Sequence, residues 1–273
     1  MTGTLYVVAT PIGNLADASP RSLETLRSVD LIACEDTRTS SKLLAHFGIG
    51  VRTVALHEHN ERAASKELIQ ALRQGRNIAL ISDAGTPALS DPGAWLVAQA
   101  HAAGIRVSPL PGASAAAADS PGFPASRFLF AGFLPAQAGA RRKALETLEL
   151  AYPVLIYEAP HRVRETLEDL ARRFGAEREI VIARELSKKF EEVARMPLGA
   201  APGWLDARRE RAQGEFVLVL APGEERPRAA VDAERVLEVL LGSLPPSEAA
   251  KLAARITGQP KGGLYKRALK RTK

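Results

Sequence analysis

Short apolar runs alternate with amphipathic stretches along most of this chain, and loops of small residues separate them. The pattern is clear over residues 77–119. The apolar run Asn77 to Ser82 has the length of a buried strand, and an alanine-rich helix is expected to begin at Asp91 and Pro92. Ile105 to Leu110 predicts the next strand, and a glycine loop follows each of the two strands. A strand–helix–strand unit predicts parallel strands with ligand-binding loops at their carboxyl ends.

The same alternation predicts two α/β/α domains, residues 1–118 and 119–225, and a small helical extension, residues 226–273. The first domain should also contain strands at Leu5–Ala9, Leu31–Cys34 and Val51–Leu56, and helices at Pro20–Ser28, Thr39–Phe47 and Asn60–Gln74. The second should contain strands at Phe128–Ala131, Val154–Glu158, Glu179–Ala183, Phe190–Met196 (an edge strand) and Glu215–Leu220, and helices at Arg141–Leu150, Val163–Phe174 and Trp204–Gln213. The extension should form helices at Asp232–Leu241, Ser247–Ile256 and Gly262–Arg271, the last two with helix-turn-helix spacing. Linkers are expected at residues 119–126 and 222–228 because both are rich in proline or glycine.

Basic residues are concentrated at the end of the chain. Residues 246–273 hold eight Lys or Arg and one Glu, a net charge of +7, although the whole chain carries only +6. The remaining residues therefore carry −1. A basic segment attached to a nearly neutral body indicates a polyanionic partner, most simply nucleic acid. A solubilising tail without a partner is the alternative.

Composition excludes several classes of protein. A single cysteine, Cys34, leaves no internal disulfide framework, and no signal peptide or run of 18 apolar residues is present, which predicts a cytoplasmic protein with no membrane partner. The chain lacks a P-loop, a dinucleotide-binding glycine fingerprint and a G-x-S-x-G elbow. The pair His57 and His59 has no third ligand at a telling distance, so no metal is expected.

Polar and small residues gather directly after the predicted strands. Thr10-Pro-Ile-Gly-Asn follows the first strand, Glu35-Asp-Thr-Arg-Thr the second, and Asp83-Ala-Gly-Thr-Pro the fourth. Such loops bring backbone amides and carbonyls close to a ligand and suit a compact polar cofactor held without a metal. Asp83 could accept hydrogen bonds from ribose hydroxyls, or it could only cap the turn after its strand.

Taken together, these loops resemble the tetrapyrrole methylase superfamily. The shared strings are Thr10-Pro-Ile-Gly-Asn, Cys34-Glu-Asp-Thr-Arg, Ile81-Ser-Asp-Ala-Gly-Thr-Pro, Pro111-Gly-Ala-Ser-Ala, Gly132-Phe-Leu-Pro, Tyr157-Glu-Ala-Pro-His-Arg and Ala183-Arg-Glu-Leu-Ser-Lys-Lys. The second, sixth and seventh strings are most similar to the branch that methylates a cytidine ribose 2′-hydroxyl in the decoding centre of small-subunit (16S) ribosomal RNA. The resemblance covers residues 4 to about 220, and the basic tail agrees with that branch. Cys34 and Ala159 depart from the pattern without changing a charged group.

The resemblance implies S-adenosylmethionine bound in a folded conformation in a cleft between the two α/β domains. It also implies a homodimer, which the raw sequence does not show. Carried over by position, the cofactor contacts are Pro11, Ser82, Asp83, Thr86, Ser114, Ala115, Phe133, Leu134, Glu158 and Leu186.

Methylation of a ribose hydroxyl requires alignment of the acceptor with the methyl donor and a general base within hydrogen-bond reach. The candidates for the base at strand ends are Glu185 and Lys188 first, then Glu35, Asp36 and His161, and the sequence does not choose among them. Arginine suits phosphate because its planar fork bonds two oxygens at once, although a surface ion pair is an alternative for each arginine alone. The expected RNA contacts are Arg38, Arg162, Arg184, Lys189, Lys261, Lys266 and Arg267.

Two other functions stay open at this point. The same fold could methylate a small tetrapyrrole, which the +7 tail disfavours. A non-catalytic RNA-binding protein is disfavoured because the glycine–proline loops and their acids are intact. The expected partner is small-subunit ribosomal RNA, free or in the assembled subunit.

Overall fold

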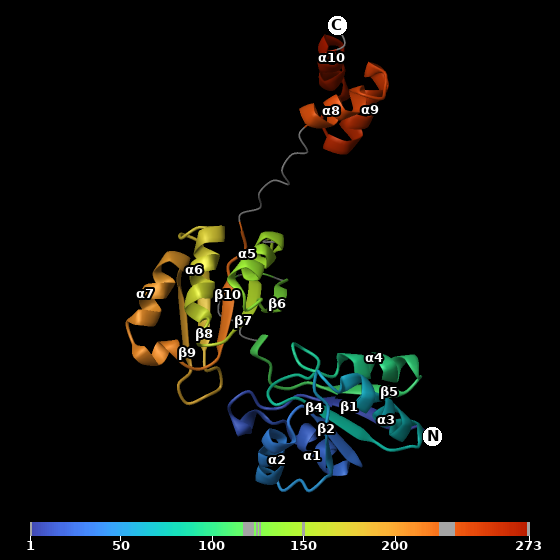
Figure 1. Cartoon of the computed structure of the whole chain (residues 1–273), viewed down its shortest axis with the longest axis vertical. Helices are drawn as coiled ribbons and strands as arrows, with labels where there is room; N and C mark the ends of the chain where they lie inside the picture. The colour runs from blue at the N-terminus through green and yellow to red at the C-terminus, as the bar shows by residue number, and fades with distance from the viewer. Residues whose placement is uncertain are drawn as a thin grey trace. The chain divides into compact units, whose positions relative to one another are not determined.

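The computed structural model describes residues 2–116, 123, 125, 127–148, 151–223 and 233–271. The chain divides into two compact units, residues 1–222 and residues 223–273 (Figure 1). The first unit contains two five-stranded sheets, and the second is helical. None of the helices in the described ranges has the length and apolar composition needed to cross a bilayer.

The first sheet is parallel, with strand order β3-β2-β4-β1-β5. Its inner strands β2 and β4 are buried on both faces, as their unbroken apolar runs indicate. Leu68 and Leu96 pack on one face and Leu26 and Leu44 on the other, so helices cover both sides. The strands are β1 (Thr4–Val8), β2 (Leu31–Cys34), β3 (Thr53–Ala55), β4 (Ile78–Ile81) and β5 (Arg106–Leu110), and the helices are α1 (Pro20–Ser28), α2 (Thr37–His46), α3 (Glu61–Arg73) and α4 (Ala94–Ala102), with a 3₁₀ turn η1 (Leu15–Asp17).

The second sheet is mixed, with strand order β6-β7-β10-β8-β9. Strand β10 pairs antiparallel with both of its neighbours, and β9 lies at the edge, as the alternating pattern of that segment predicts. Leu145, Leu167 and Leu205, one from each helix, share a single apolar cluster, so all three helices cover the same face. The strands are β6 (Leu129–Phe133), β7 (Val154–Glu158), β8 (Glu179–Arg184), β9 (Glu192–Pro197) and β10 (Phe216–Leu220), and the helices are α5 (Ala138–Thr147), α6 (Val163–Phe174) and α7 (Ala201–Asp206), with 3₁₀ turns η3 (Leu198–Ala200) and η4 (Arg209–Ala212).

Three sequence-based helix predictions were wrong in their bounds. The helix expected at Arg141–Leu150 begins three residues earlier, at Ala138, and ends at Thr147. The helix expected to begin at Asp91 begins at Ala94, because the Glu61 carboxylate of α3 accepts hydrogen bonds from the backbone N–H groups of Gly93 (2.8 Å) and Trp95 (3.1 Å) and so caps α4 from outside. The helix expected at Trp204–Gln213 ends at Asp206 and is followed by the separate turn η4. Most of both expected linkers lies outside the described residues.

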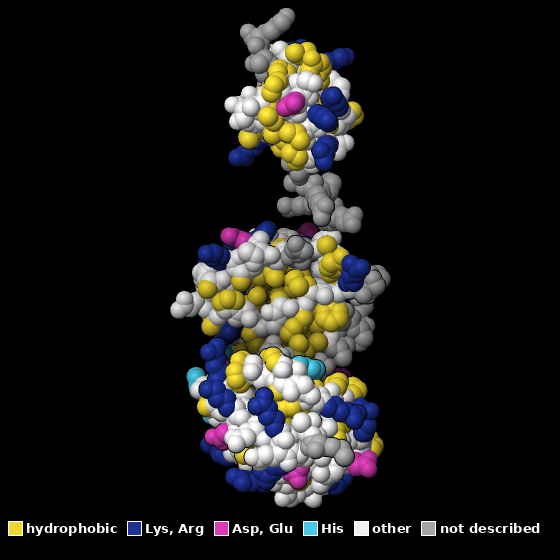
Figure 2. Space-filling model, turned by 90° about the vertical axis from the view of Figure 1, so that its right-hand side faces the viewer, with side chains coloured by type: hydrophobic (Ala, Val, Ile, Leu, Met, Phe, Trp, Pro, Cys, Tyr) yellow, Lys and Arg dark blue, Asp and Glu magenta, His cyan; other side chains and the backbone are white. Residues whose placement is uncertain are grey.

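The second unit is a bundle of α8 (Ala233–Leu241), α9 (Pro246–Thr257) and α10 (Lys261–Arg271). Its core is rich in alanine, with Leu237 and Leu264 as the large members, so the helices pack closely. Gly258, at φ 71°, ends α9 in the left-handed conformation and allows the short turn into α10. On the visible face, Lys and Arg side chains border an apolar patch (Figure 2).

A buried ion pair ties α5 to α6. The Arg141 side chain is 1% exposed, and its Nε lies 2.8 Å from Oδ2 of Asp169, whose side chain is 2% exposed. Burial raises the pKa of the Asp169 carboxyl, but hydrogen bonds from Arg142 and Arg141 outweigh it and hold the pKa below its usual value. The carboxylate therefore stabilises the fold at neutral pH, and this stabilisation is lost as the pH falls through the lowered folded-state pKa.

We expect Arg141→Ala to lower the free energy of unfolding by about 3 kcal/mol, because it removes the buried partner of a buried carboxylate. The matched control is Arg142→Ala, which removes a 56% exposed guanidinium from the same carboxylate and should cost less than about 1 kcal/mol. Urea unfolding followed by circular dichroism measures both. Equal losses would mean that burial of the pair does not matter.

Candidate active site

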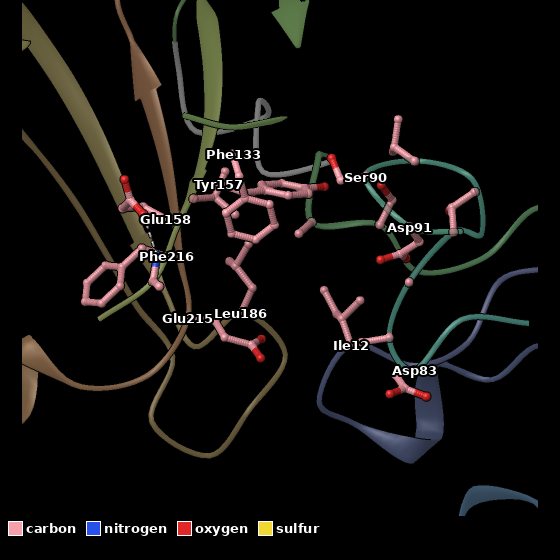
Figure 3. A pocket seen from close by; sticks show the side chains of 18 of the residues that line it. Ile12, Asp83, Ser90, Asp91, Phe133, Tyr157, Glu158, Leu186, Glu215 and Phe216 are labelled. Atoms are coloured by element: carbon pink, nitrogen blue, oxygen red, sulfur yellow. Dashed lines mark hydrogen bonds between the residues drawn. The ribbon is translucent and has the colours of Figure 1, made fainter. Parts of the chain in front are cut away.

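A cavity of about 500 Å³ lies where the strand ends of the two α/β domains face each other (Figure 3). This volume is within the range of small-molecule sites. No Lys or Arg is among its lining residues in the described part of the chain, which suits a ligand with a positive centre. The lining residues are Ile12, Asp83, Ala84, Gly85, Thr86, Leu89, Ser90, Asp91, Ser114, Ala115, Phe133, Tyr157, Glu158, Ala159, Pro160, His161, Leu186, Glu215, Phe216 and Val217.

The loops after β1 and β4 brace each other on the first-domain side. Thr10 and Gly85 exchange backbone hydrogen bonds of 2.9 and 3.0 Å. The hydroxyl of Ser82 donates to the carbonyl of Gly85 (3.1 Å) and is buried beneath the loop, so Ser82 supports the cavity wall instead of lining it. Pro11 is half-buried between Thr10 and the lining residue Ile12.

Glu158 presents a fully engaged carboxylate on the second-domain side. Its oxygens accept hydrogen bonds from the Ala159 N–H (2.8 Å), the Thr166 hydroxyl (2.6 Å) and Arg162 Nη2 (3.3 Å). Arg162 also donates to the Leu134 carbonyl (2.6 Å). These bonds occupy the guanidinium inside the domain, and the geometry does not support the phosphate contact predicted for Arg162. Leu134 itself is 5% exposed in the apolar core, so its side chain does not reach the cavity.

The loop over residues 184–189 carries the two residues first expected to act as the base. The backbones of Glu185 (φ 53°) and Ser187 (φ 63°) are left-handed, which is strained for residues other than glycine. Within this loop, Leu186 lines the cavity, and Glu185 and Lys188 are not among its lining residues. A Cβ on Gly13 would lie 2.2 Å from Cγ of Lys188, so a side chain at position 13 would require the Lys188 side chain to move.

Neither Glu185 nor Lys188 is suited to act as the base, because Lys188 stays protonated and Glu185 is a weakened base paired with it. Lys188 Nζ donates to Oε1 of Glu185 (2.9 Å) and Oε2 of Glu215 (3.1 Å). Burial lowers the pKa of Lys188, but these bonds outweigh it and raise the pKa above its usual value, so the ammonium stays charged. Burial raises the pKa of Glu185, but hydrogen bonds from the Glu215 backbone and Lys188 outweigh it and lower that pKa. The structure thus does not favour the first choice from sequence.

Acidic residues gather at the ends of β2 and β4. Asp36 caps α2 by accepting from the Arg38 N–H (2.8 Å), and its other oxygen pairs with Arg38 Nη2 (2.8 Å). The side-chain hydrogen bond from Arg38 lowers the pKa of Asp36 to about 2, so Asp36 is a weak base. Burial raises the pKa of Glu35, and the charge of Asp83 raises it further. Asp83 lines the cavity, and Glu35 and Asp36 do not. No group of three or more His, Cys, Asp or Glu among the described residues is arranged to hold a metal ion.

The cations expected to contact RNA fall into two groups. Arg184 is 6% exposed and donates to three backbone carbonyls, those of Glu210, Gln213 and Phe190, so its role is structural. Arg38, with a side chain 88% exposed, and the exposed Lys189 are able to reach a phosphate. In the second unit, Lys261, Lys266 and Arg267 are exposed, and Arg267 also pairs with Glu234 (2.7 Å).

The structure brings eight of the residues expected at the site to the cavity wall and adds others that the sequence analysis missed. The eight are Asp83, Thr86, Ser114, Ala115, Phe133, Glu158, His161 and Leu186. The main omissions are Ser90, Asp91 and Tyr157. Tyr157 contacts Phe130 and Phe133 edge to face, and its hydroxyl lies near Ser114 of the other domain.

Asp91 was missed because it was interpreted as a helix cap. The signal that could have corrected this is the dipeptide Pro92-Gly93, which marks a turn more often than a helix start. Burial raises the pKa of Asp91, the charge of Glu35 raises it as well, and the nearby Ser82 hydroxyl lowers it, so that the pKa is about 6.

Comparison with known proteins agrees with this architecture. The family model Tetrapyrrole (Corrin/Porphyrin) Methylases matches residues 4–202, and the model RsmI C-terminal HTH domain matches residues 227–272. The solved structure of uroporphyrin-III-C-methyltransferase from Thermus thermophilus is similar with a TM-score of 0.57 and 19% identity, covering 80% of this chain and 94% of that one. A diphthine synthase structure is similar with a TM-score of 0.58 and 17% identity, covering 80% and 90%. The fold is therefore that of the tetrapyrrole methylases.

Relatives found by sequence share a much larger fraction of identical residues with this chain than these solved structures do. The ribosomal RNA small subunit methyltransferase I of Pseudomonas aeruginosa is 51% identical over 277 residues, covering 98% of each chain. The protein of the same name from Escherichia coli O157:H7 is 48% identical over 274 residues, covering 98% of this chain and 95% of the relative. The chain belongs to the tetrapyrrole methylase family and, within it, to the group of ribosomal RNA small subunit methyltransferase I.

Proposed function

We propose that this protein transfers a methyl group from S-adenosylmethionine to the ribose 2′-hydroxyl of a cytidine in the decoding centre of small-subunit (16S) ribosomal RNA. The observation that carries the proposal is the identity of about one half, over nearly the whole chain, to ribosomal RNA small subunit methyltransferases I. Methyltransferases of this family use S-adenosylmethionine. The substrate would be met in the cytoplasm.

The cavity fits the cofactor in its charge and its polar groups. S-adenosylmethionine carries a sulfonium cation, which supplies an activated methyl group. The lining set contains the acids Asp83 and Asp91 and no Lys or Arg, so a cation is not repelled. Hydroxyl and backbone groups at Thr86, Ser114 and Leu186 would hold polar atoms of the cofactor. The aromatic side chains of Phe133 and Tyr157 would exclude water from the reacting atoms.

The basic second unit suits the RNA backbone. Contacts of Lys and Arg with phosphates add affinity and salt dependence without reading sequence. An unpaired cytidine would then enter the cavity by leaving its stack, which places one ribose hydroxyl near the lining residues. Arg38 and Lys189 are exposed in the first unit and would contribute further phosphate contacts.

The test is methyl transfer from labelled S-adenosylmethionine to small ribosomal subunits that lack the modification, with free 16S RNA and a porphyrinoid in parallel. Label at one cytidine ribose, resistant to nuclease at that position, is the expected result. Label in the porphyrinoid alone would move the function to small tetrapyrroles. A protein that binds the cofactor and the subunit but transfers no label to either substrate would contradict an enzymatic role.

We also propose that the protein acts as a homodimer. The proposal rests on the resemblance to its family and on the surface of the second α/β domain, where hydrophobic side chains gather on the visible face (Figure 2). Phe190 and Val193, at 65% and 46% exposure, add apolar surface at the edge of the sheet. Light scattering coupled to gel filtration should give twice the mass of the chain. A mass of one chain at micromolar concentration would contradict this.

A further inference from the structure

The loop between β4 and α4 carries an acidic side chain into the cavity. Asp91 and Ser90 lie on one side, and Tyr157 and Leu186 lie on the other (Figure 3). Asp83 lies beyond Ile12 as seen from Tyr157, so the two first-domain acids occupy different parts of the site (Figure 3). Asp91 therefore faces the space between the two domains.

The loop that carries Asp91 is strained in its own backbone and is contacted by two other elements. Ala88 and Ser90 both have a φ of 65°, which is costly for residues other than glycine and is not needed for a simple turn. Glu61 of α3 accepts from the N–H groups of Gly93 and Trp95 and anchors the end of the loop. A Cβ on Gly132 of β6 would lie 3.0 Å from Oγ of Ser90, so the second domain abuts the loop directly. The strain and the anchors together fix where the carboxyl lies.

The other acids near the cavity are occupied. Glu158 accepts from a backbone N–H, a hydroxyl and a guanidinium. Glu215 pairs with Lys188, and Asp83 accepts from the Asp36 N–H (3.4 Å). Asp91 makes no ion pair within the described part of the chain, and the nearby Ser82 hydroxyl is neutral and donates to the Gly85 carbonyl. Among the described acids that line the cavity, Asp91 alone has a carboxylate that neither pairs with a cation nor accepts a hydrogen bond from a backbone N–H.

We propose that Asp91 is the general base that takes the proton from the acceptor ribose hydroxyl. This role rests on the proposed methyl transfer to RNA. As the hydroxyl oxygen forms its bond to the methyl carbon, the carbon–sulfur bond breaks and its electron pair stays on sulfur. The hydroxyl proton passes to a carboxylate oxygen of Asp91 and then to solvent. The balance requires no oxidant, metal or further reactant.

The charge around Asp91 suits this role. Burial raises its pKa most, the charges of Glu35 and Asp83 also raise it, the Ser82 hydroxyl lowers it, and the resulting pKa is about 6. The carboxyl is therefore ionised at neutral pH and more basic than an ordinary aspartate, which favours proton transfer. The titratable groups facing it from the second domain are Tyr157, Glu158, His161 and Glu215.

The first test is Asp91→Asn, which keeps the shape and removes the basic oxygen. With saturating cofactor and small subunits, kcat should fall about 100-fold or more, while the Kd of the cofactor measured by calorimetry stays within about threefold. The matched control is Glu24→Gln. Glu24 is an exposed residue of α1 that does not line the cavity, so this variant removes a negative charge elsewhere and should keep full activity. A loss of less than fivefold in Asp91→Asn, with the wild type active, would overturn the inference.

The pH dependence separates a base from a structural residue. In the wild type, kcat should rise about tenfold per pH unit up to about pH 6 and then level off, because the carboxylate is the active form. In Asp91→Asn this plateau should be lost, and the remaining rate should rise with hydroxide concentration. A plateau that persists in Asp91→Asn and disappears in His161→Gln would assign the proton to His161 and overturn the inference.

A measurement without turnover checks the same group. Carbon-13 spectra of protein labelled at the aspartate carboxyl carbons, compared between the wild type and Asp91→Asn, identify the Asp91 signal. Its midpoint should lie near pH 6 and move to lower pH in Glu35→Gln, because a neighbouring negative charge is removed. A midpoint near 4 would overturn the inference. A wild type that labels no RNA would instead overturn the proposed function, and this role with it, whatever the titration shows.

Discussion

A protein that ends at Pro222 should bind small-subunit ribosomal RNA about 100-fold more weakly than the full chain at moderate salt, and should bind S-adenosylmethionine within about threefold of it. The reason is the separation of charge and cavity along the chain. Residues 246–273 carry +7 and the residues before them −1, and every residue lining the cavity precedes residue 222. Because the shortened protein neutralises fewer phosphates, its binding releases fewer counterions, and the salt dependence should become shallower as well.

The structure sets the best position for this cut. A cut near Pro245, which the basic composition alone favours, would leave α8 without α9 and α10, although Ala233 and Leu237 belong to their shared core. The apolar clusters of the first unit contain no described residue beyond Ala221, so a chain ending at Pro222 keeps them whole.

Filter binding at two salt concentrations and calorimetry measure the two affinities. The matched control is the full chain with Lys261, Lys266 and Arg267 all changed to Gln, which lowers charge without removing a helix and should account for a large part of the RNA effect. If both affinities fell together, the second unit would be part of the methylase fold. If neither fell, the basic segment would be a solubilising tail.

Most of the elements were predictable because their determinants are local. Strands β2 and β7 and helices α1 and α6 begin and end where the apolar runs, the capping Ser19 and the terminating Gly175 indicate. The loops at the strand ends were predictable for the same reason, and with them much of the cavity wall. The order of the second sheet was not, because the pairing of β10 between β7 and β8 joins segments that are far apart in the sequence.

The roles of charged residues depend on partners that the sequence does not reveal. Arg184 was expected at a phosphate and instead meets three carbonyls from residues 6 to 29 positions further along. Lys188 was expected to be a candidate base, but its ammonium donates to Glu215, which lies 27 residues away in the sequence. Asp91 was assigned to a cap that Glu61, from another helix, provides. The sequence predicted that charged residues would lie at the strand ends. Which of them remain unpaired and able to take part in the reaction depends on the contacts of the folded chain.

Filling the cavity should abolish cofactor binding, with the largest effect from Ser114→Trp. Ser114 lines the cavity, and its hydroxyl lies near Tyr157 of the opposite domain. An indole at this position would project into a space of about 500 Å³ and displace both the cofactor and the contact between the domains. We expect the affinity for S-adenosylmethionine to fall about 100-fold or more, since a ligand of this class depends on burial of most of its surface.

The matched control is Ser114→Ala, which removes only the hydroxyl and should weaken binding by about tenfold at most. Asp83→Asn should also weaken it, by about tenfold, because it removes a lining charge that faces a cationic ligand. Calorimetry gives the affinities, and thermal unfolding checks that each variant is folded. If folded Ser114→Trp bound the cofactor as the wild type does, the cavity between the two domains would not be its site. The proton transfer assigned to Asp91 would then lack the aligned methyl donor that it requires, so this variant tests the geometric premise of the mechanism independently of any rate.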